Sequence, residues 1–163
     1  MKLGVVADTH LNKWSKGLPL QLVHGLSGVD HILHAGDLVT NEVVAWLNVL
    51  APVEAIAGNN DPWPLFQTLG RKKVLEFDGV KIGLIHGDCD GKMTLECAKS
   101  AFTTERVECI VFGHSHNPYC QMHDGILLFN PGSPTRKRSN RQFSFGTLLI
   151  KDGLIFPELH YFD

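Results

Sequence analysis

The sequence predicts an α/β domain whose two parts have different strand patterns. Over the first two-thirds, short apolar runs alternate with segments of helical spacing, which is the pattern of βαβ units in a parallel sheet. In the last third the runs become aromatic-rich and are separated by Asp-Gly turns, which favours antiparallel strands. The chain of 163 residues suits a single domain over residues 1–163, because no linker, repeat or low-complexity segment divides it.

The apolar runs place the expected elements along the chain. Buried strands are expected at Leu3–Ala7, His31–Ala35, Val53–Ala57, Val80–Ile85 and Cys109–Phe112. Helical spacing is expected within residues 11–28, over residues 43–50 and over residues 92–106. Residues 73–77 precede an Asp-Gly turn and are expected to form a hairpin with the strand after it. Antiparallel strands are expected at Ile126–Phe129, Phe145–Ile150 and Leu154–Tyr161.

Composition excludes several classes of protein. Hydrophobic residues make up 44% and charged residues 20%, and the formal net charge is −2, so neither nucleic acid nor an anionic membrane is expected as the main partner. No run approaches the ~20 apolar residues of a spanning helix, and the apolar start is too short for a secretion signal. The cysteines form no C-x-x-C pair and are expected as free thiols in the cytoplasm: Cys89, Cys97, Cys109 and Cys120.

Residues that can bind a metal follow five successive strand ends. Taken singly, each has an ordinary alternative: Asp8 and Asp37 could cap helices, His10 could be solvated, and Asn59 could belong to a turn. In a βαβ-type sheet, however, the carboxyl ends of the strands meet on one side and collect the ligand site. The candidate ligands are Asp8, His10, Asp37, Asn59, His86, His114 and His116.

The size and chemistry of this set favour two metal ions. One tetrahedral zinc takes about four ligands, so seven suit two ions that share a carboxylate. Nitrogen and oxygen donors without thiolate favour Mn²⁺, Fe or Zn²⁺ over Mg²⁺, Ca²⁺ or Cu(I). Two divalent ions, two aspartates and a hydroxide leave a net charge of roughly +1, which suits an anionic phosphoester. His31 and His34 pair with no other motif and are expected to be structural.

These motifs resemble the calcineurin-like metallophosphoesterases, and the short chain resembles the small YfcE-type phosphodiesterases among them. The resemblance covers residues 8–116 and rests on Asp8 with His10, Gly36-Asp37, Gly58-Asn59-Asn60-Asp61, His86, and Gly113-His114-Ser115-His116. It is supported downstream by Asn130-Pro131-Gly132-Ser133. It implies a four-layer α/β/β/α sandwich.

The resemblance also implies roles for single residues. Asp8, His10 and His116 would hold one divalent metal, Asn59, His86 and His114 the other, and Asp37 would bridge them. The implied activity is a phosphodiesterase in which a hydroxide bridging the metals attacks phosphorus. Mn²⁺ is the first choice of metal, with Fe, Zn²⁺ or Ni²⁺ as alternatives.

The chain departs from the family pattern at Asn60, where many members have histidine. Asparagine can hydrogen-bond the phosphate but cannot protonate a leaving group at neutral pH. Asn60 is therefore expected to contact substrate and Asp37 to act with it as a catalytic residue. The stretch from Arg136 to Arg141 is either a solvated loop or the rim of the site, and in the second case Arg136 or Arg138 meets the substrate phosphate.

Other functions remain open at this point. The same fold could serve as a catalytically silent scaffold like the small retromer subunit, or act as a nucleotide phosphatase or pyrophosphatase. The complete ligand set argues against a scaffold, and no base-recognition motif supports a nucleotide enzyme. The expected partners are a small phosphoester substrate and, in a dimer or tetramer, further copies of the chain, with no specific nucleic acid and no membrane.

Overall fold

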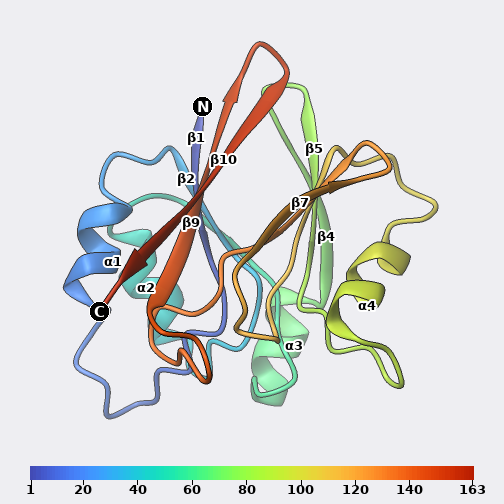
Figure 1. Ribbon diagram of the computed structural model, residues 1–163. Helices are drawn as coiled ribbons and strands as arrows, with labels where there is room; N and C mark the ends of the chain where they lie inside the picture. The colour runs from blue at the N-terminus through green and yellow to red at the C-terminus, as the bar shows by residue number, and fades with distance from the viewer.

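The computed structural model describes residues 1–163 as two facing β-sheets with helices on both outer sides (Figure 1). The strands are β1 (Lys2–Val6), β2 (His31–His34), β3 (Val53–Ala55), β4 (Lys72–Phe77), β5 (Val80–Ile85), β6 (Cys109–Val111), β7 (Tyr119–His123), β8 (Ile126–Asn130), β9 (Phe143–Lys151) and β10 (Leu154–Phe162). The helices are α1 (Leu20–Gly25), α2 (Glu42–Asn48), α3 (Trp63–Leu69) and α4 (Thr94–Ala101).

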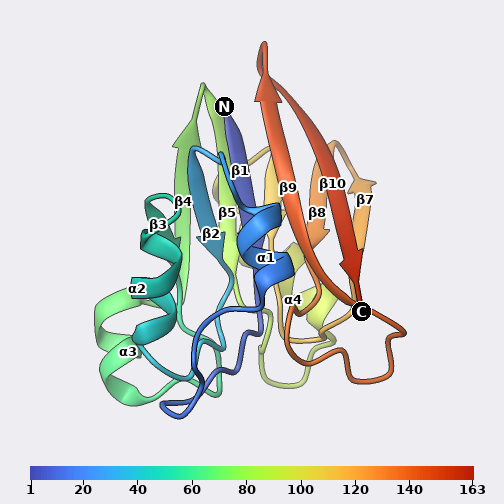
Figure 2. The same ribbon diagram turned by 90° about the vertical axis from the view of Figure 1, so that its left-hand side faces the viewer.

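Both sheets are five-stranded and mixed. The first has the order β10-β9-β1-β2-β3, with β1, β2 and β3 parallel, β9 antiparallel to β1, and β10 antiparallel to β9 (Figure 2). The second has the order β4-β5-β6-β8-β7. Leu3 on β1 lies opposite His31 on β2 and Leu148 on β9, so the first and last parts of the chain share one sheet.

Three apolar clusters separate the layers. Alternate residues of β1, such as Leu3 and Val5, point between the sheets and join the largest cluster, whereas Val6 points outward to α1 and α2. On the other side of the molecule, Ala98 and Phe102 pack against Ile110 beneath α4. The layers therefore run helix, sheet, sheet, helix, and the predicted α/β/β/α sandwich is confirmed.

The strands are divided between the two sheets in a way that the alternation of apolar runs and helical segments does not predict. The βαβ pattern suggested one sheet for the first five strands, but β5 and β6 lie in the second sheet. β8 was expected to be antiparallel, but it pairs in parallel with β6 and antiparallel only with β7. Apolar periodicity identifies a buried strand without naming its neighbours, which explains both differences.

The expectation of four free thiols is wrong for two of them. Cys89, in the loop after β5, forms a disulfide with Cys97 on α4, while Cys109 and Cys120 are free. The first turn of α4 brings the two Cα atoms to 5.6 Å, a proximity that a spacing of 8 residues does not reveal. Thiol content therefore gives no support for the cytoplasm, which stays a prediction.

Helix lengths also bear on membrane association. The longest helix, α4, has 8 residues, and the chain has no helix of the length and hydrophobicity needed to cross a bilayer.

Candidate metal centre

The loops after β1, β2, β3, β5 and β6 meet at one end of the sandwich, the lower end in Figure 1. The first sheet supplies Asp8, His10, Asp37 and Asn59, and the second supplies His86, His114 and His116. Burial is graded across this set. The side chains of Asp8, Asp37, His86 and His116 are buried, those of His10 and His114 are half-buried, and that of Asn59 is exposed. The centre is thus open to solvent on the Asn59 side.

Much of this set is held in a backbone conformation that side chains rarely adopt. The φ angles are +54° at Asp8, +42° at His10, +59° at Asp37, +66° at His114 and +61° at His116. A left-handed conformation at a non-glycine residue costs on the order of 1 kcal/mol or more, and it persists only where the surrounding structure enforces it. Such strain concentrated at one cluster indicates a functional site.

Glycines let the loops approach one another. A Cβ on Gly58 would overlap the Asp37 carboxylate, and one on Gly113 would lie 2.9 Å from Asp8 Oδ2. Since real Cβ contacts are longer than 3.0 Å, these positions require glycine. The sequence pattern of glycine before a ligand residue is explained by this close approach.

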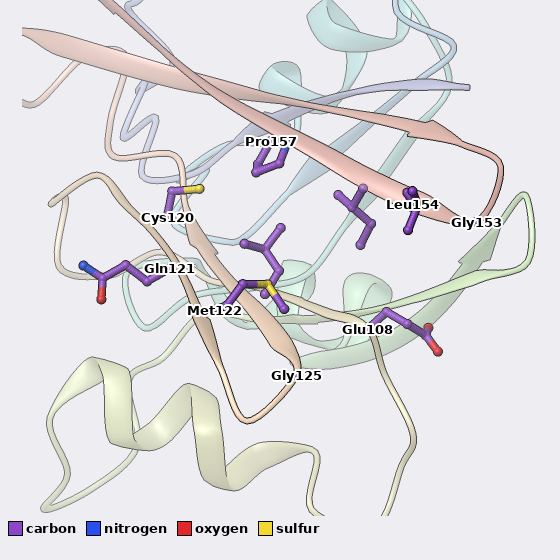
Figure 3. Close-up of a pocket in the computed structure, with 10 residues that line it drawn as sticks. Glu108, Cys120, Gln121, Met122, Gly125, Gly153, Leu154 and Pro157 are labelled. Carbon is purple, nitrogen blue, oxygen red and sulfur yellow. The ribbon is translucent and has the colours of Figure 1, made fainter.

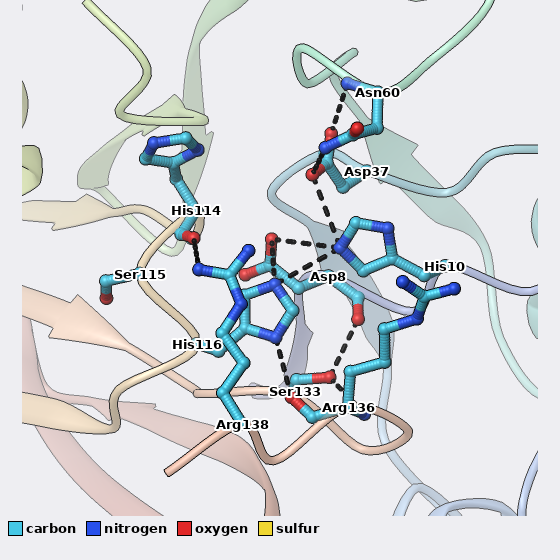
Figure 4. A network of polar contacts seen from close by, with 12 residues as sticks. Asp8, His10, Asp37, Asn60, His114, Ser115, His116, Ser133, Arg136 and Arg138 are labelled. Atoms are coloured by element: carbon cyan, nitrogen blue, oxygen red, sulfur yellow. Dashed lines mark hydrogen bonds and ion pairs between the residues drawn. The ribbon is translucent and has the colours of Figure 1, made fainter.

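Asp8, His10 and His116 form the first cluster (Figure 4). His116 Nε2 lies 3.5 Å from Asp8 Oδ1 and 3.2 Å from His10 Nε2, and His10 Nε2 lies 3.9 Å from Asp8 Oδ1. The other nitrogen of His116, Nδ1, donates to the Arg136 carbonyl at 2.6 Å. Because a carbonyl only accepts, Nδ1 carries the proton and Nε2 presents a lone pair to the centre.

Asp37, His86 and again Asp8 form the second cluster, with 3.9 Å between His86 Nε2 and Asp8 Oδ1. Asp37 Oδ2 lies 3.4 Å from Nε2 of both His10 and His86, so it stands between the two clusters. His86 Nδ1 donates to the Ala35 carbonyl at 2.7 Å, which turns its Nε2 toward the carboxylates. His114 completes this side: its ring meets His86 edge-on at 5.2 Å.

His114 also contacts Asn59, with 3.1 Å between Nδ1 and Oδ1. The structure therefore brings together all seven predicted ligands. It also separates His114 from His116, since the first faces His86 and Asn59 and the second faces Asp8 and His10.

Unpaired polar atoms test whether the centre fits a metal. Both carboxylate oxygens of Asp8 and Nε2 of His86 are buried without any hydrogen-bond partner. A buried carboxylate without a partner is rare because losing water costs several kcal/mol. Divalent cations bound here would satisfy these atoms, and carboxylate oxygen with imidazole nitrogen is a common donor set for such ions. The residues present therefore fit the group.

The pKa values follow from the same crowding. Burial raises the pKa of Asp8 to about 7 and lowers that of His10 to about 4. Burial alone would raise the pKa of Asp37, but the nearby His86 imidazole and the hydrogen bonds from Asn60 hold it well below its usual range. For His86, burial is outweighed by the nearby carboxylates of Asp37 and Asp8, which raise its pKa to about 9. These carboxylates and imidazoles shift one another's pKa values because they are buried close together. A bound cation would hold the carboxylates ionised and the imidazoles neutral.

Comparison with known proteins identifies the family. Residues 1–153 match the calcineurin-like phosphoesterase superfamily domain. The chain belongs to this superfamily. Among curated proteins, the probable metallophosphoesterase MJ0623 of Methanocaldococcus jannaschii is 37% identical over 142 residues, which cover 85% of this chain and 70% of that protein.

Solved structures agree with the superfamily fold. A single mutant of Vps29 from Entamoeba histolytica has a TM-score of 0.79 and 25% identity, and each chain is covered over 100% of its length. A novel archaeal phosphodiesterase has a TM-score of 0.76 and 22% identity, over 98% of this chain and 100% of that one. The likeness of the second structure concerns the fold alone.

Two residues beyond the ligand set shape this phosphoesterase domain. Asn60 donates its backbone N–H to Asp37 Oδ1 at 2.8 Å and its side-chain amide to Asp37 Oδ2 at 2.7 Å. Asp61 receives backbone N–H groups from Asp37 at 2.9 Å, Gly58 at 2.8 Å and Val39 at 2.6 Å. No separate role was expected for Asp61, although its place in the Gly-Asn-Asn-Asp motif could have indicated one.

The other candidate residues of the phosphoesterase domain lie as follows. Arg136 and Arg138 are exposed and flank the centre in Figure 4, and Arg138 Nη1 is 3.4 Å from the His114 carbonyl. His34 is buried and its Nδ1 accepts from the Gly36 N–H at 3.2 Å, in keeping with a structural role. His31 packs against Phe77 at 5.3 Å between ring centroids, away from the ligand set.

Proposed function

We propose that this protein is a metal-dependent phosphodiesterase with a dinuclear centre. The observation that carries the proposal is the unpaired Asp8 carboxylate facing the unpaired Nε2 of His86 inside a buried cluster. Asp8, His10 and His116 would hold one divalent ion, Asn59, His86 and His114 would hold the other, and Asp37 would contact both. Mn²⁺ suits the mixed nitrogen and oxygen donors, with Fe, Zn²⁺ or Ni²⁺ as alternatives.

The chain's own residues prepare the site for a phosphoester. The carbonyls of Arg136 and Ala35 fix the tautomers of His116 and His86, so that their lone pairs face inward. Asn60 fixes both oxygens of Asp37. When bound, two divalent ions lower the pKa of a shared water, which makes it a nucleophile, and offset charge on the phosphoryl oxygens. Arg136 and Arg138 offer guanidinium groups to the substrate phosphate from the exposed rim.

The choice of a diester is supported by the comparisons. The Phosphodiesterase MJ0936 of Methanocaldococcus jannaschii is 23% identical over 146 residues, and the archaeal neighbour also bears that name. Asn60 cannot donate a proton to a leaving group, so within this class we expect a preference for esters with good leaving groups. A nucleotide phosphatase or pyrophosphatase receives no comparable support.

A phosphoester panel with added Mn²⁺ tests the proposal. We expect the wild type to hydrolyse activated diesters such as bis-p-nitrophenyl phosphate and to lose activity when Mn²⁺ is removed. Asp37→Ala should abolish activity, because its carboxylate contacts both histidine groups. Equal activity in the two proteins, or none in either, would contradict a dinuclear enzyme.

A protein-interaction role is the second candidate, and one feature favours it besides the likeness to Vps29. A mostly apolar cavity of about 430 Å³ opens between the β7–β8 hairpin and β10 (Figure 3). Met122 and Leu154 line it and are 61% and 62% exposed. None of its lining residues belongs to the metal centre. An interaction role predicts that a variant without activity, such as Asp37→Ala, keeps its assembly state in size-exclusion chromatography with multi-angle light scattering.

A further inference from the structure

The loop from Ser133 to Asn140 is bonded to both chain segments that carry the first cluster. Toward the segment after β1, Ser133 Oγ donates to the Asp8 carbonyl at 2.7 Å, and Thr135 Oγ1 donates to the Thr9 carbonyl at 2.5 Å. Toward the segment after β6, Asn140 Nδ2 donates to the His116 carbonyl at 2.9 Å. The loop thus spans Asp8 and His116, whose positions in the sequence are far apart.

The main chain of Arg136 is the centre of this connection. Its N–H donates to Ser133 Oγ at 2.9 Å, and its carbonyl accepts the Nδ1 proton of His116 at 2.6 Å. Ser133 is 1% exposed, so no water competes for its hydroxyl. One buried hydroxyl therefore links the backbone of Asp8 to the peptide that fixes the His116 tautomer (Figure 4).

We propose that Ser133 is a positioning residue that couples the first metal half-site to the substrate arginine. It does so by holding Arg136 in place. The Arg136 carbonyl keeps Nε2 of His116 directed at the metal position, while the Arg136 side chain would meet the substrate phosphate in the proposed function. This inference rests on the proposed function for its substrate, but its metal part can be measured without turnover.

The second half-site provides an internal reference. His86 takes its orientation from the Ala35 carbonyl on the first sheet, and no residue between Ser133 and Asn140 contacts its ring nitrogens. Arg138 of the loop reaches this half-site only at the main-chain carbonyl of His114, at 3.4 Å, and leaves the His114 ring free to face Asn59. Loss of the Ser133 hydroxyl should therefore weaken the ion held by Asp8, His10 and His116 and leave the other ion nearly unchanged. A general loss of stability would weaken both.

Mn²⁺ titration calorimetry on the metal-stripped full chain tests this coupling. For Ser133→Ala we expect one of the two Mn²⁺ affinities to fall about 10- to 100-fold, the range typical when a partner of a metal-binding histidine is lost. The other affinity should change less than about twofold, and Ser133→Thr, which keeps the hydroxyl, should recover part of the loss. Ser139→Ala is the matched control, because Ser139 is exposed on the same loop and its side chain makes no hydrogen bond.

Kinetics at saturating Mn²⁺ provide the second readout. With both sites filled, Ser133→Ala should raise KM for a diester more than it lowers kcat, since it displaces Arg136, which the proposed function assigns to the substrate phosphate. If Ser133→Ala folds poorly, Asn140→Ala provides a second variant. It removes the hydrogen bond from the half-buried Asn140 side chain to the His116 carbonyl, and it should likewise weaken one Mn²⁺ affinity and raise KM.

The outcomes separate the two proposals. Ser133→Ala and Asn140→Ala variants that bind both ions like Ser139→Ala, or that weaken both ions equally, would overturn the role of Ser133 and leave the phosphodiesterase intact. A wild type that binds two ions but hydrolyses no phosphoester would overturn the proposed function, while the calorimetry would still support or reject the coupling of Ser133 to His116.

Discussion

Replacing Asp61 by asparagine should destabilise the protein even though the side chain keeps its size. The carboxylate is only 6% exposed and accepts three backbone N–H groups, two on Oδ2 from Asp37 and Gly58 and one on Oδ1 from Val39. Asparagine has one acceptor oxygen, and its NH₂ group must face at least one of these donors. The substitution therefore exchanges a hydrogen bond for a contact between two donors.

The expected cost follows from these contacts. A hydrogen bond to a charged group contributes about 1.5–3 kcal/mol, and a buried N–H left without a partner costs about 1–3 kcal/mol. Because the same N–H is counted in both values, we expect Asp61→Asn to lower the free energy of unfolding by about 2–4 kcal/mol. The Asp37 backbone is one of the donors, so Mn²⁺ affinity should fall as well.

Urea unfolding in the presence of EDTA measures the stability without any contribution from metal. Asp90→Asn is the matched control, since Asp90 is exposed and its side chain makes no hydrogen bond. A difference between the two variants below about 0.5 kcal/mol, the size of an ordinary surface effect, would refute the reasoning.

Single contacts at His34, Asn60 and Arg138 lead to three more predictions. Burial lowers the pKa of His34 to about 3, below its value of 6.5 in the unfolded chain, so the unfolded state binds the extra proton between these values. Stability should fall as pH drops through that window, by up to about 1.4 kcal/mol per pH unit. His34→Asn keeps an acceptor for the Gly36 N–H and should flatten this slope in urea unfolding measured from pH 7 to pH 4. Asn60→His should raise kcat on diesters with poor leaving groups and leave activated diesters nearly unchanged, and a loss on both would contradict the account of Asn60. Arg138→Glu should raise KM several-fold through charge repulsion of the phosphate, whereas an unchanged KM would identify a merely solvated loop.

Most of the buried strands were predictable from the sequence because they are short apolar runs closed by glycine or a polar residue. Helix α3 was not, because Pro62-Trp63-Pro64 is typical of a loop, yet proline is tolerated in the first turn of a helix. Strand β7 was missed because it is a mostly uncovered edge strand whose residues do not alternate. The disulfide from Cys89 to Cys97 had no motif to announce it.

The site divides in the same way. The meeting of its seven candidate ligands was predictable because strand ends of one polarity lie together at one end of the fold. The groups that orient them were not, because they join residues far apart in the sequence: Ser133 and Asp8 are separated by 125 positions. A serine in an Asn-Pro-Gly-Ser turn indicates a turn, and only the folded chain reveals which carbonyl its hydroxyl reaches.

The two-sheet arrangement strengthens the case for metal beyond what one sheet would offer. Asp8 and His10 leave the first sheet and His116 leaves the second, while Asn59 leaves the first and His86 and His114 leave the second. Each proposed ion would therefore bind both sheets at once and close the sandwich at the end where the strained loops meet. Ligand binding to the native state alone stabilises it by mass action. Saturating Mn²⁺ should thus raise the unfolding temperature of the wild type more than that of His116→Ala. In that variant only one of the two ions would still have ligands from both sheets.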